Sequence, residues 1–81
     1  MSWFIYIIRS KLTGRYYRGC CEDFEKRLTE HNSGKTRSTK AYHPWVKIYI
    51  ETFENKTDAL KREKYFKTRS GYRCLKQMGV T

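Results

Sequence analysis

The chain has 81 residues, of which 16% are aromatic, and its 18 lysines and arginines outnumber its 8 acidic residues to give a net charge of +10. This length predicts one small domain, residues 1–81, whose core gains from the large area that each aromatic side chain buries. Because the bases spread along the whole sequence, the charge favours a nucleic acid as partner over a membrane surface, with a merely soluble basic protein as the alternative.

The first half of the chain predicts a strand, a turn, a returning strand and a helix, at residues 3–8, 11–15, 15–21 and 23–34. The stretch "WFIYII" is continuously apolar and rich in β-branched and aromatic residues, which is typical of a strand buried on both faces. Gly14 is expected at positive φ in the turn. The helix is expected to open at Glu22 or Asp23 and to close at Gly34.

The second half predicts a loop, a strand and two helices, at residues 35–44, 45–53, 58–69 and 72–78. The loop is polar and basic, and its length of about ten residues suggests function or mobility. Thr57 is expected to cap the first of these helices, and Ser70-Gly71 to end it. Trp3 and Trp45 are expected in the core. The order β-β-α-β-α-α indicates an α+β domain with a small sheet.

The cysteines and the N-terminal residues exclude further classes of protein. Cys20, Cys21 and Cys74 have neither the spacing of a zinc site nor that of a disulfide framework, so we expect reduced thiols used in packing. The apolar run at 3–8 is too short for a secretion signal or a membrane span. We therefore expect a cytoplasmic protein.

Both longer helices place polar side chains on the stripe that should face the core. In the first helix, Arg27 and His31 share the stripe of Phe24 and Leu28. In the second, Glu63 shares the stripe of Ala59, Leu60 and Phe66. A carboxylate on a buried side needs an arginine or a metal ion as partner. The alternative is a Glu63–Arg27 salt bridge that only holds the two helices together.

Two tyrosines are expected on one face of the hairpin. A turn centred on residues 12 and 13 would place Tyr17 opposite Ile8, and Tyr6 lies two residues from Ile8 on that same face. Sheet packing is the alternative role for these side chains. Together with Arg27, His31 and Glu63, they could hydrolyse phosphodiesters: a carboxylate for a hydrated divalent cation, a planar guanidinium for the phosphate, and a phenol or imidazole for the proton of water.

Four short motifs resemble the GIY-YIG nuclease family: "FIY" at 4–6, "YRG" at 17–19, Arg and His at 27 and 31, and "ALKRE" at 59–63. The resemblance covers about residues 3 to 70, and the two longer helices look like those of the small stand-alone bacterial members. These members are grouped with the nuclease domain of the excision-repair endonuclease subunit. The resemblance implies a three-stranded antiparallel sheet flanked by helices.

The resemblance also implies a role for each residue of the set. Tyr6 and Tyr17 match the two motif tyrosines, either of which could be the general base or position the water, with Tyr6 favoured. Arg27 matches the arginine that contacts the phosphate. His31 matches the helix position that assists the tyrosine or contacts the phosphate. Glu63 matches the sole carboxylate ligand of the metal, Mg²⁺ or Mn²⁺.

Three residues depart from the family pattern. Phe4 stands where the family has glycine, and Cys21 stands where the small members have threonine or serine. Arg18 replaces an aliphatic residue and should point away from Tyr17, toward the sheet edge or toward DNA. The further bases expected to contact DNA phosphates are Lys35, Arg37, Lys40, Lys64 and Lys67, with a solvated loop as the alternative for the first three.

The sequence therefore predicts a metal-dependent DNA endonuclease that acts on branched or damaged DNA in repair or recombination. No organic cofactor is expected, and a protein partner could supply specificity, since the chain carries no appended binding domain. Two alternatives stay open: a non-catalytic nucleic-acid-binding module that keeps the nuclease fold, and a structural domain with an incidental salt bridge.

Overall fold

The computed structural model describes residues 2–37 and 39–79. Its elements in chain order are β1 (Trp3–Ser10), β2 (Tyr16–Cys21), α1 (Phe24–Asn32), a short 3₁₀ helix η1 (Lys40–Tyr42), β3 (Trp45–Phe53), α2 (Lys56–Phe66) and α3 (Arg69–Gln77). The strands form one antiparallel sheet in the order β2-β1-β3. This is the α+β architecture that the sequence predicts, with the same order of elements.

The hairpin has the register expected from its turn, with Tyr17 opposite Ile8. The hydroxyl of Ser10 accepts hydrogen bonds from the backbone N–H of Leu12 and of Thr13, both at 3.1 Å, which folds the chain back at the end of β1. Gly14 then takes a φ of +79°, as predicted. Because this turn sets the register, it also decides which side chains of β2 share a face with Tyr6.

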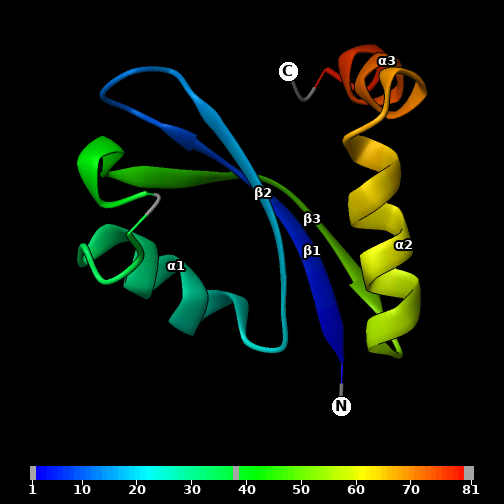
Figure 1. The fold of residues 1–81 in the computed structure, drawn as a ribbon, viewed down its shortest axis with the longest axis horizontal. Coiled ribbons are helices and arrows are strands. Elements are labelled where there is room, and N and C mark those ends of the chain that lie inside the picture. Colours follow the sequence, from blue (N-terminus) through cyan, green and yellow to red (C-terminus); the bar gives the residue numbers. More distant parts are fainter. Residues whose placement is uncertain (1, 38, 80–81) are drawn as a thin grey trace.

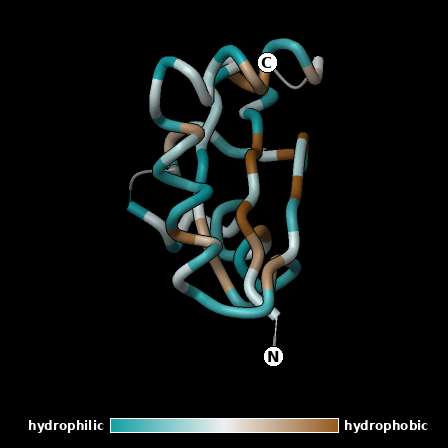
Figure 2. Tube along the Cα trace, turned by 90° about the vertical axis from the view of Figure 1, so that its right-hand side faces the viewer, coloured by the Kyte–Doolittle hydropathy of each residue, from teal (hydrophilic) through white to brown (hydrophobic). Residues whose placement is uncertain are grey.

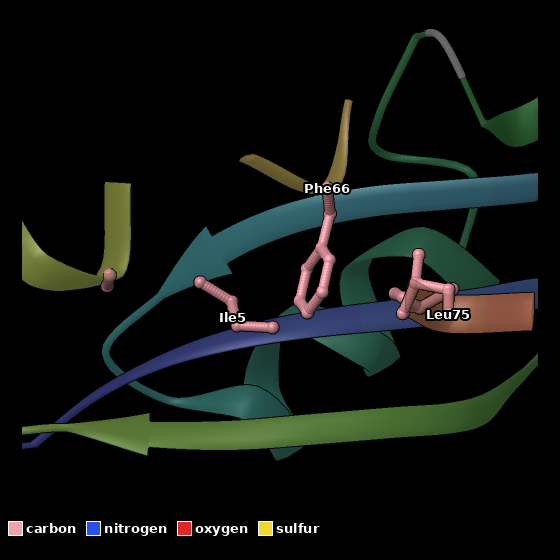
Figure 3. Close-up of a cluster of buried hydrophobic side chains, with 5 residues drawn as sticks. Ile5, Phe66 and Leu75 are labelled. Atoms are coloured by element: carbon pink, nitrogen blue, oxygen red, sulfur yellow. The ribbon is translucent and has the colours of Figure 1, made fainter. Parts of the chain in front are cut away.

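The central strand β1 supplies side chains to two separate cores, one on each face of the sheet. Ile5 and Ile7 pack with Phe66 and Leu75 of the C-terminal helices, and Figure 3 shows three of these side chains meeting above the sheet. Tyr6 and Ile8 belong to the other core. In Figure 1, α1 lies on one side of the sheet and α2 on the other. In Figure 2, the hydrophobic colours appear mainly where the tube passes through the strands.

Helix α1 begins where the sequence predicts, and its cap decides between the two expected residues. The Asp23 side chain accepts a hydrogen bond from the N–H of Lys26 at 3.2 Å, which satisfies one free donor of the first turn. Phe24 and His31 are buried, as the stripe predicts. Arg27 is only partly inward, since 37% of its side chain remains exposed.

The predicted boundaries of α2 and α3 are wrong in three respects. Asn55, not Thr57, caps α2, because its side chain accepts from the N–H of Asp58 at 2.9 Å. The helix ends at Phe66, and the Thr68 hydroxyl caps α3 by accepting from the N–H of Gly71 at 3.1 Å. Ser70 and Gly71 therefore lie inside the first turn of α3. Gly71 permits a close approach of the two helices, since a Cβ there would lie 1.9 Å from the carbonyl oxygen of Tyr65.

Three other side chains show how far the core predictions hold. Trp45 is buried, and its indole N–H donates to the carbonyl of Thr39 at 3.0 Å. Trp3 is only half-buried at the edge of the core, with the Lys56 ammonium 5.2 Å from its ring centre. Leu60 is 39% exposed, so its predicted place in the core is wrong. The buried residues of α2 are Ala59 and Phe66, and they define the side of this helix that faces the core. Leu60 lies outside that side.

Candidate active site

The two motif tyrosines lie on the face of the sheet that α1 covers. Their ring centres are 6.4 Å apart. Tyr6 is 1% exposed and lies opposite Gly19 of β2, whereas Tyr17 is half-buried. A Cβ at Gly19 would lie 2.4 Å from the Tyr6 hydroxyl oxygen, so the missing side chain at this position makes room for the phenol. The glycine of the "YRG" motif is thus a requirement of the Tyr6 position.

Helix α1 brings His31 and Arg27 to the same face. The Tyr6 hydroxyl and Nε2 of His31 share a hydrogen bond of 3.0 Å, in which both groups are buried. The ring centre of Tyr17 lies 5.0 Å from that of His31, with the rings edge to face. Arg27, one turn earlier on the helix, stays at the rim and forms an ion pair with Glu30 at 3.3 Å. A buried tyrosine–histidine pair therefore lies beside a guanidinium that solvent can reach.

The surroundings of this pair keep both groups uncharged at neutral pH. Burial raises the pKa of Tyr6 to about 12, and the neighbouring Arg27 offsets only part of this increase. Burial also lowers the pKa of His31, and the positive charge of Arg27 lowers it further. Neither a phenolate nor an imidazolium is therefore present before substrate binds.

Glu63 lies on α2, which packs on the opposite face of the sheet from α1. Its carboxylate forms an ion pair with Lys67 at 3.1 Å, and 17% of its side chain is exposed. Among residues 2–37 and 39–79, no hydrogen bond or ion pair joins Glu63 to Tyr6, Tyr17, Arg27 or His31. The alternative Glu63–Arg27 salt bridge is thus not formed, because each residue pairs within its own helix.

Two consecutive cysteines of β2 are influenced by the charges of Glu63 and Arg27, one from each face of the sheet. Cys21 packs on the face of α1, where burial raises its pKa to about 11 against the opposing effect of Arg27. Cys20 packs on the face of α2, where burial and the charge of Glu63 raise its pKa. β2 is an edge strand of the sheet, and Arg27 and Glu63 influence consecutive cysteines of this strand that pack on opposite faces.

The candidate metal ligand of the predicted set is a single carboxylate, that of Glu63. In the part of the chain that the structure describes, no group of three or more histidine, cysteine, aspartate or glutamate side chains could hold a metal ion. Glu63 alone offers one carboxylate, already shared with Lys67. Such a donor set fits a hard cation that keeps most of its water and gains further ligands from a phosphate.

The bases predicted to contact DNA have different surroundings. Lys35, Arg37, Lys40 and Lys64 are exposed, and Lys67 is exposed but paired with Glu63. Arg18 lies opposite Ile7 and so points away from Tyr17, as predicted. Its Nε is buried and makes no hydrogen bond with any described residue. Arg18 therefore belongs to the side of the sheet that carries Glu63.

Sequence reasoning missed the residue behind His31. The side chain of Thr39 is fully buried, and its hydroxyl lies 2.8 Å from Nδ1 of His31. Thr39 belongs to the polar segment after α1, where a threonine gives no periodic signal. The segment is held in place through Trp45, whose backbone N–H donates to the side-chain oxygen of Asn32 at 2.5 Å.

The fold and site together define the class of protein. An antiparallel sheet with tyrosines on adjacent strands, followed by a helix with an arginine and a histidine, is the arrangement expected of a GIY-YIG domain. Residues 2–74 match the GIY-YIG catalytic domain. The chain belongs to the GIY-YIG family, a family of nucleases that generally depend on divalent metals.

Bacterial proteins of similar length resemble this chain over most of its residues. It is 42% identical over 74 residues to a UPF0213 protein of Staphylococcus saprophyticus, a match that covers 90% of this chain and 89% of the relative. A UPF0213 protein of Staphylococcus aureus is 38% identical over 68 residues, covering 83% and 82%. The solution NMR structure of a UPF0213 protein from Bacillus halodurans superposes with a TM-score of 0.58 at 27% identity, covering 96% and 85%.

The described helices are all short and polar compared with a membrane span. None of them combines the length and the apolar character that crossing a bilayer would require.

Proposed function

We propose that this protein is a metal-dependent endonuclease that hydrolyses phosphodiester bonds of DNA, with branched or damaged DNA in repair or recombination as its substrate. The observation that carries the proposal is the position of Arg27. Its guanidinium is accessible to solvent and lies beside the buried Tyr6–His31 pair, so a phosphate bound by Arg27 would lie next to a proton-accepting system.

In this proposal the residues on the α1 face of the sheet have separate catalytic roles. Arg27 exchanges Glu30 for the scissile phosphate and stabilises the charge that develops on its oxygens. Tyr17, the more exposed tyrosine, orients the attacking water. Tyr6 takes the proton of that water while it passes its own proton to Nε2 of His31, which lies 3.0 Å away. A tyrosine with a pKa of about 12 can serve in this way, because no free phenolate has to form.

Glu63 would hold the divalent cation, Mg²⁺ or Mn²⁺, at the other side of the β2 edge. When bound, the cation supplies positive charge for the phosphate and for the leaving oxygen. Because Glu63 is a single carboxylate paired with Lys67, its metal affinity without substrate should be weak, and metal and DNA should bind cooperatively. A DNA backbone that follows the edge of β2 would reach Arg27 and Glu63 at the same time.

The exposed bases would contribute binding that does not depend on sequence. Lys35, Arg37 and Lys40 are exposed and follow α1 in the chain. Each base that contacts a phosphate should add about 0.9 to the slope of log binding constant against log salt. Specificity for a DNA structure would then come from its shape, or from a protein partner.

The first test is cleavage of supercoiled plasmid and of branched oligonucleotides with Mg²⁺, Mn²⁺ or EDTA. Arg27→Ala and Glu63→Gln should each reduce metal-dependent nicking at least about 100-fold, in line with the loss of one charge-stabilising group, while DNA binding persists. Glu54→Gln is the control, since Glu54 is an exposed glutamate just before α2 and its replacement makes the same change of charge. Nicking that is equal in all four proteins, or absent with every substrate, would contradict the proposal.

One observation favours a second candidate, a nucleic-acid-binding module without catalysis. The proposed metal ligand is already neutralised by Lys67, and Tyr6 is almost inaccessible to water. This candidate predicts DNA binding that falls steeply with salt, no cleavage with either metal, and no effect of Glu63→Gln on binding. The same set of proteins and substrates therefore separates the two functions.

A further inference from the structure

A chain of three buried polar side chains runs from the sheet into the segment after α1. Tyr6 is 1% exposed, and His31 and Thr39 are 0% exposed. The Tyr6 hydroxyl lies 3.0 Å from Nε2 of His31, and Nδ1 of His31 lies 2.8 Å from the hydroxyl of Thr39. The Thr39 hydroxyl in turn donates to the carbonyl oxygen of Thr36 at 3.4 Å. Buried polar groups of this kind need a partner for each donor.

The direction of these hydrogen bonds follows from what each end can do. The Thr36 carbonyl, which also accepts from the N–H of Thr39 and of Lys40, lies within reach of the Thr39 hydroxyl proton, and a proton directed there leaves the lone pairs of that hydroxyl for Nδ1. At the other end, the Tyr6 proton needs an acceptor, and the neighbouring Arg27 only donates. Among the described residues, Nε2 of His31 is the acceptor within reach. Both ends therefore favour the same tautomer, with hydrogen on Nδ1 and a bare Nε2.

We propose that Thr39 is a positioning residue that fixes His31 in the Nδ1–H tautomer, so that Nε2 is ready to take the proton of Tyr6. The tautomer itself does not depend on the proposed nuclease activity, whereas its catalytic consequence rests on that activity. The position of Thr39 is also held from behind, since its carbonyl accepts from the Trp45 indole at 3.0 Å and its N–H donates to Thr36 at 3.1 Å.

The proton balance of the catalytic step shows why this tautomer is needed. Water gives one proton to the Tyr6 oxygen as the Tyr6 proton moves to Nε2 of His31. The resulting hydroxide forms a bond to phosphorus, the bond from phosphorus to the leaving oxygen breaks, and that oxygen takes a proton from solvent. His31 then carries one extra proton, which afterwards returns through the Tyr6 hydroxyl to solvent. The opposite tautomer already has hydrogen on Nε2 and could not accept the Tyr6 proton.

The direct test is the tautomer of His31, read from the ¹⁵N chemical shifts of its two ring nitrogens at pH 8. We expect Nδ1 to be protonated and Nε2 to be bare in the native protein and in Thr39→Ser, which keeps the hydroxyl. Thr39→Val has nearly the same shape without the hydroxyl, and it should lose this preference while its backbone spectrum stays folded. Hydrogen on Nε2 in the native protein would overturn the proposal, whether or not Thr39→Val folds.

Tyr6→Phe separates the effect of Thr39 on the His31 tautomer from the effect of Tyr6, which contacts the other ring nitrogen. If Thr39 fixes the tautomer, His31 keeps hydrogen on Nδ1 in Tyr6→Phe, although the phenolic donor is gone. A tautomer that changes in Tyr6→Phe and stays unchanged in Thr39→Val would assign the control to Tyr6 and overturn the proposal.

Plasmid nicking then tests the catalytic consequence. Thr39→Val should nick at least about tenfold more slowly with unchanged DNA binding, within the roughly 10²–10⁴-fold that one acid–base group contributes, and Thr39→Ser should restore the rate. Equal rates in Thr39→Val and the native protein would overturn the catalytic role of Thr39. Expected ring shifts in a protein that never cleaves DNA would support the tautomer and reject the proposed function.

Discussion

Replacing Gly19 by alanine tests whether the "YRG" glycine exists to make room for Tyr6. The new Cβ would lie 2.4 Å from the Tyr6 hydroxyl oxygen, 2.5 Å from Cζ and 2.9 Å from Cε1, whereas ordinary contacts begin near 3.4 Å. Overpacking of this kind is worth about 1–3 kcal/mol. Displacing Tyr6 would also weaken its hydrogen bond to His31, which adds about 1 kcal/mol to the loss of stability. Alanine is favoured over glycine within a strand by about 0.5–1 kcal/mol, so the net loss should be about 1–3 kcal/mol.

The measurement is the free energy of unfolding in urea, with the melting temperature as a second reading. A loss of about 1–3 kcal/mol corresponds to a decrease in Tm of roughly 4–24 °C for a domain of this size. The control is the same change in a Tyr6→Leu background, because leucine lacks the three atoms that would clash. There Gly19→Ala should be neutral or slightly stabilising. An equal loss in both backgrounds, or a more stable Gly19→Ala, would refute the steric argument.

Three further predictions concern α3, the proposed metal ligand Glu63 and the buried histidine. Gly71→Ala should lower the free energy of unfolding by more than about 1 kcal/mol, although alanine is the better helix former, because its Cβ would lie 1.9 Å from the carbonyl oxygen of Tyr65; a stabilised variant in urea would contradict this. Lys67→Met frees the Glu63 carboxylate, and the Mg²⁺ concentration for half-maximal nicking should fall by up to about fivefold, so an unchanged titration would count against Glu63 as ligand. Because burial keeps the pKa of His31 below its unfolded value near 6.5, the unfolded state takes up the proton first, and stability should decrease as pH falls from about 7 toward 5. His31→Gln should abolish most of that decrease in urea unfolding at several pH values, and a slope that persists would contradict this reasoning.

The parts of the fold that could be predicted are those set by local chemistry. The turn before Arg15 fixes the register of the hairpin, and this register places Tyr17 opposite Ile8. The Asp23 cap and the stripe of Phe24 and His31 are likewise readable within one helix. In each case the signal and the structure it produces lie within a few residues of each other.

The parts that could not be predicted depend on contacts between elements that are distant in the sequence. Helical spacing shows that Glu63 shares a side of α2 with Ala59, but not which face of the sheet α2 covers. The sequence therefore suggests one set of five inward groups, whereas the structure places Glu63 across β2 from the other four. A pattern also could not show that the Thr68 hydroxyl would start a new helix through Gly71, since that choice requires α3 to fold against α2.

The burial of Tyr6 and His31 has a consequence for how relatives of this chain are compared. Both side chains fill the core on the α1 face, and together they satisfy each other's polar atoms. A relative without nuclease activity would still be selected to keep them, because replacing either would leave a cavity or an unpaired buried group. Their retention in a sequence therefore reports a stable fold. Evolutionary signs of activity should be sought at Arg27 and Glu63, which solvent reaches and which stability requires less.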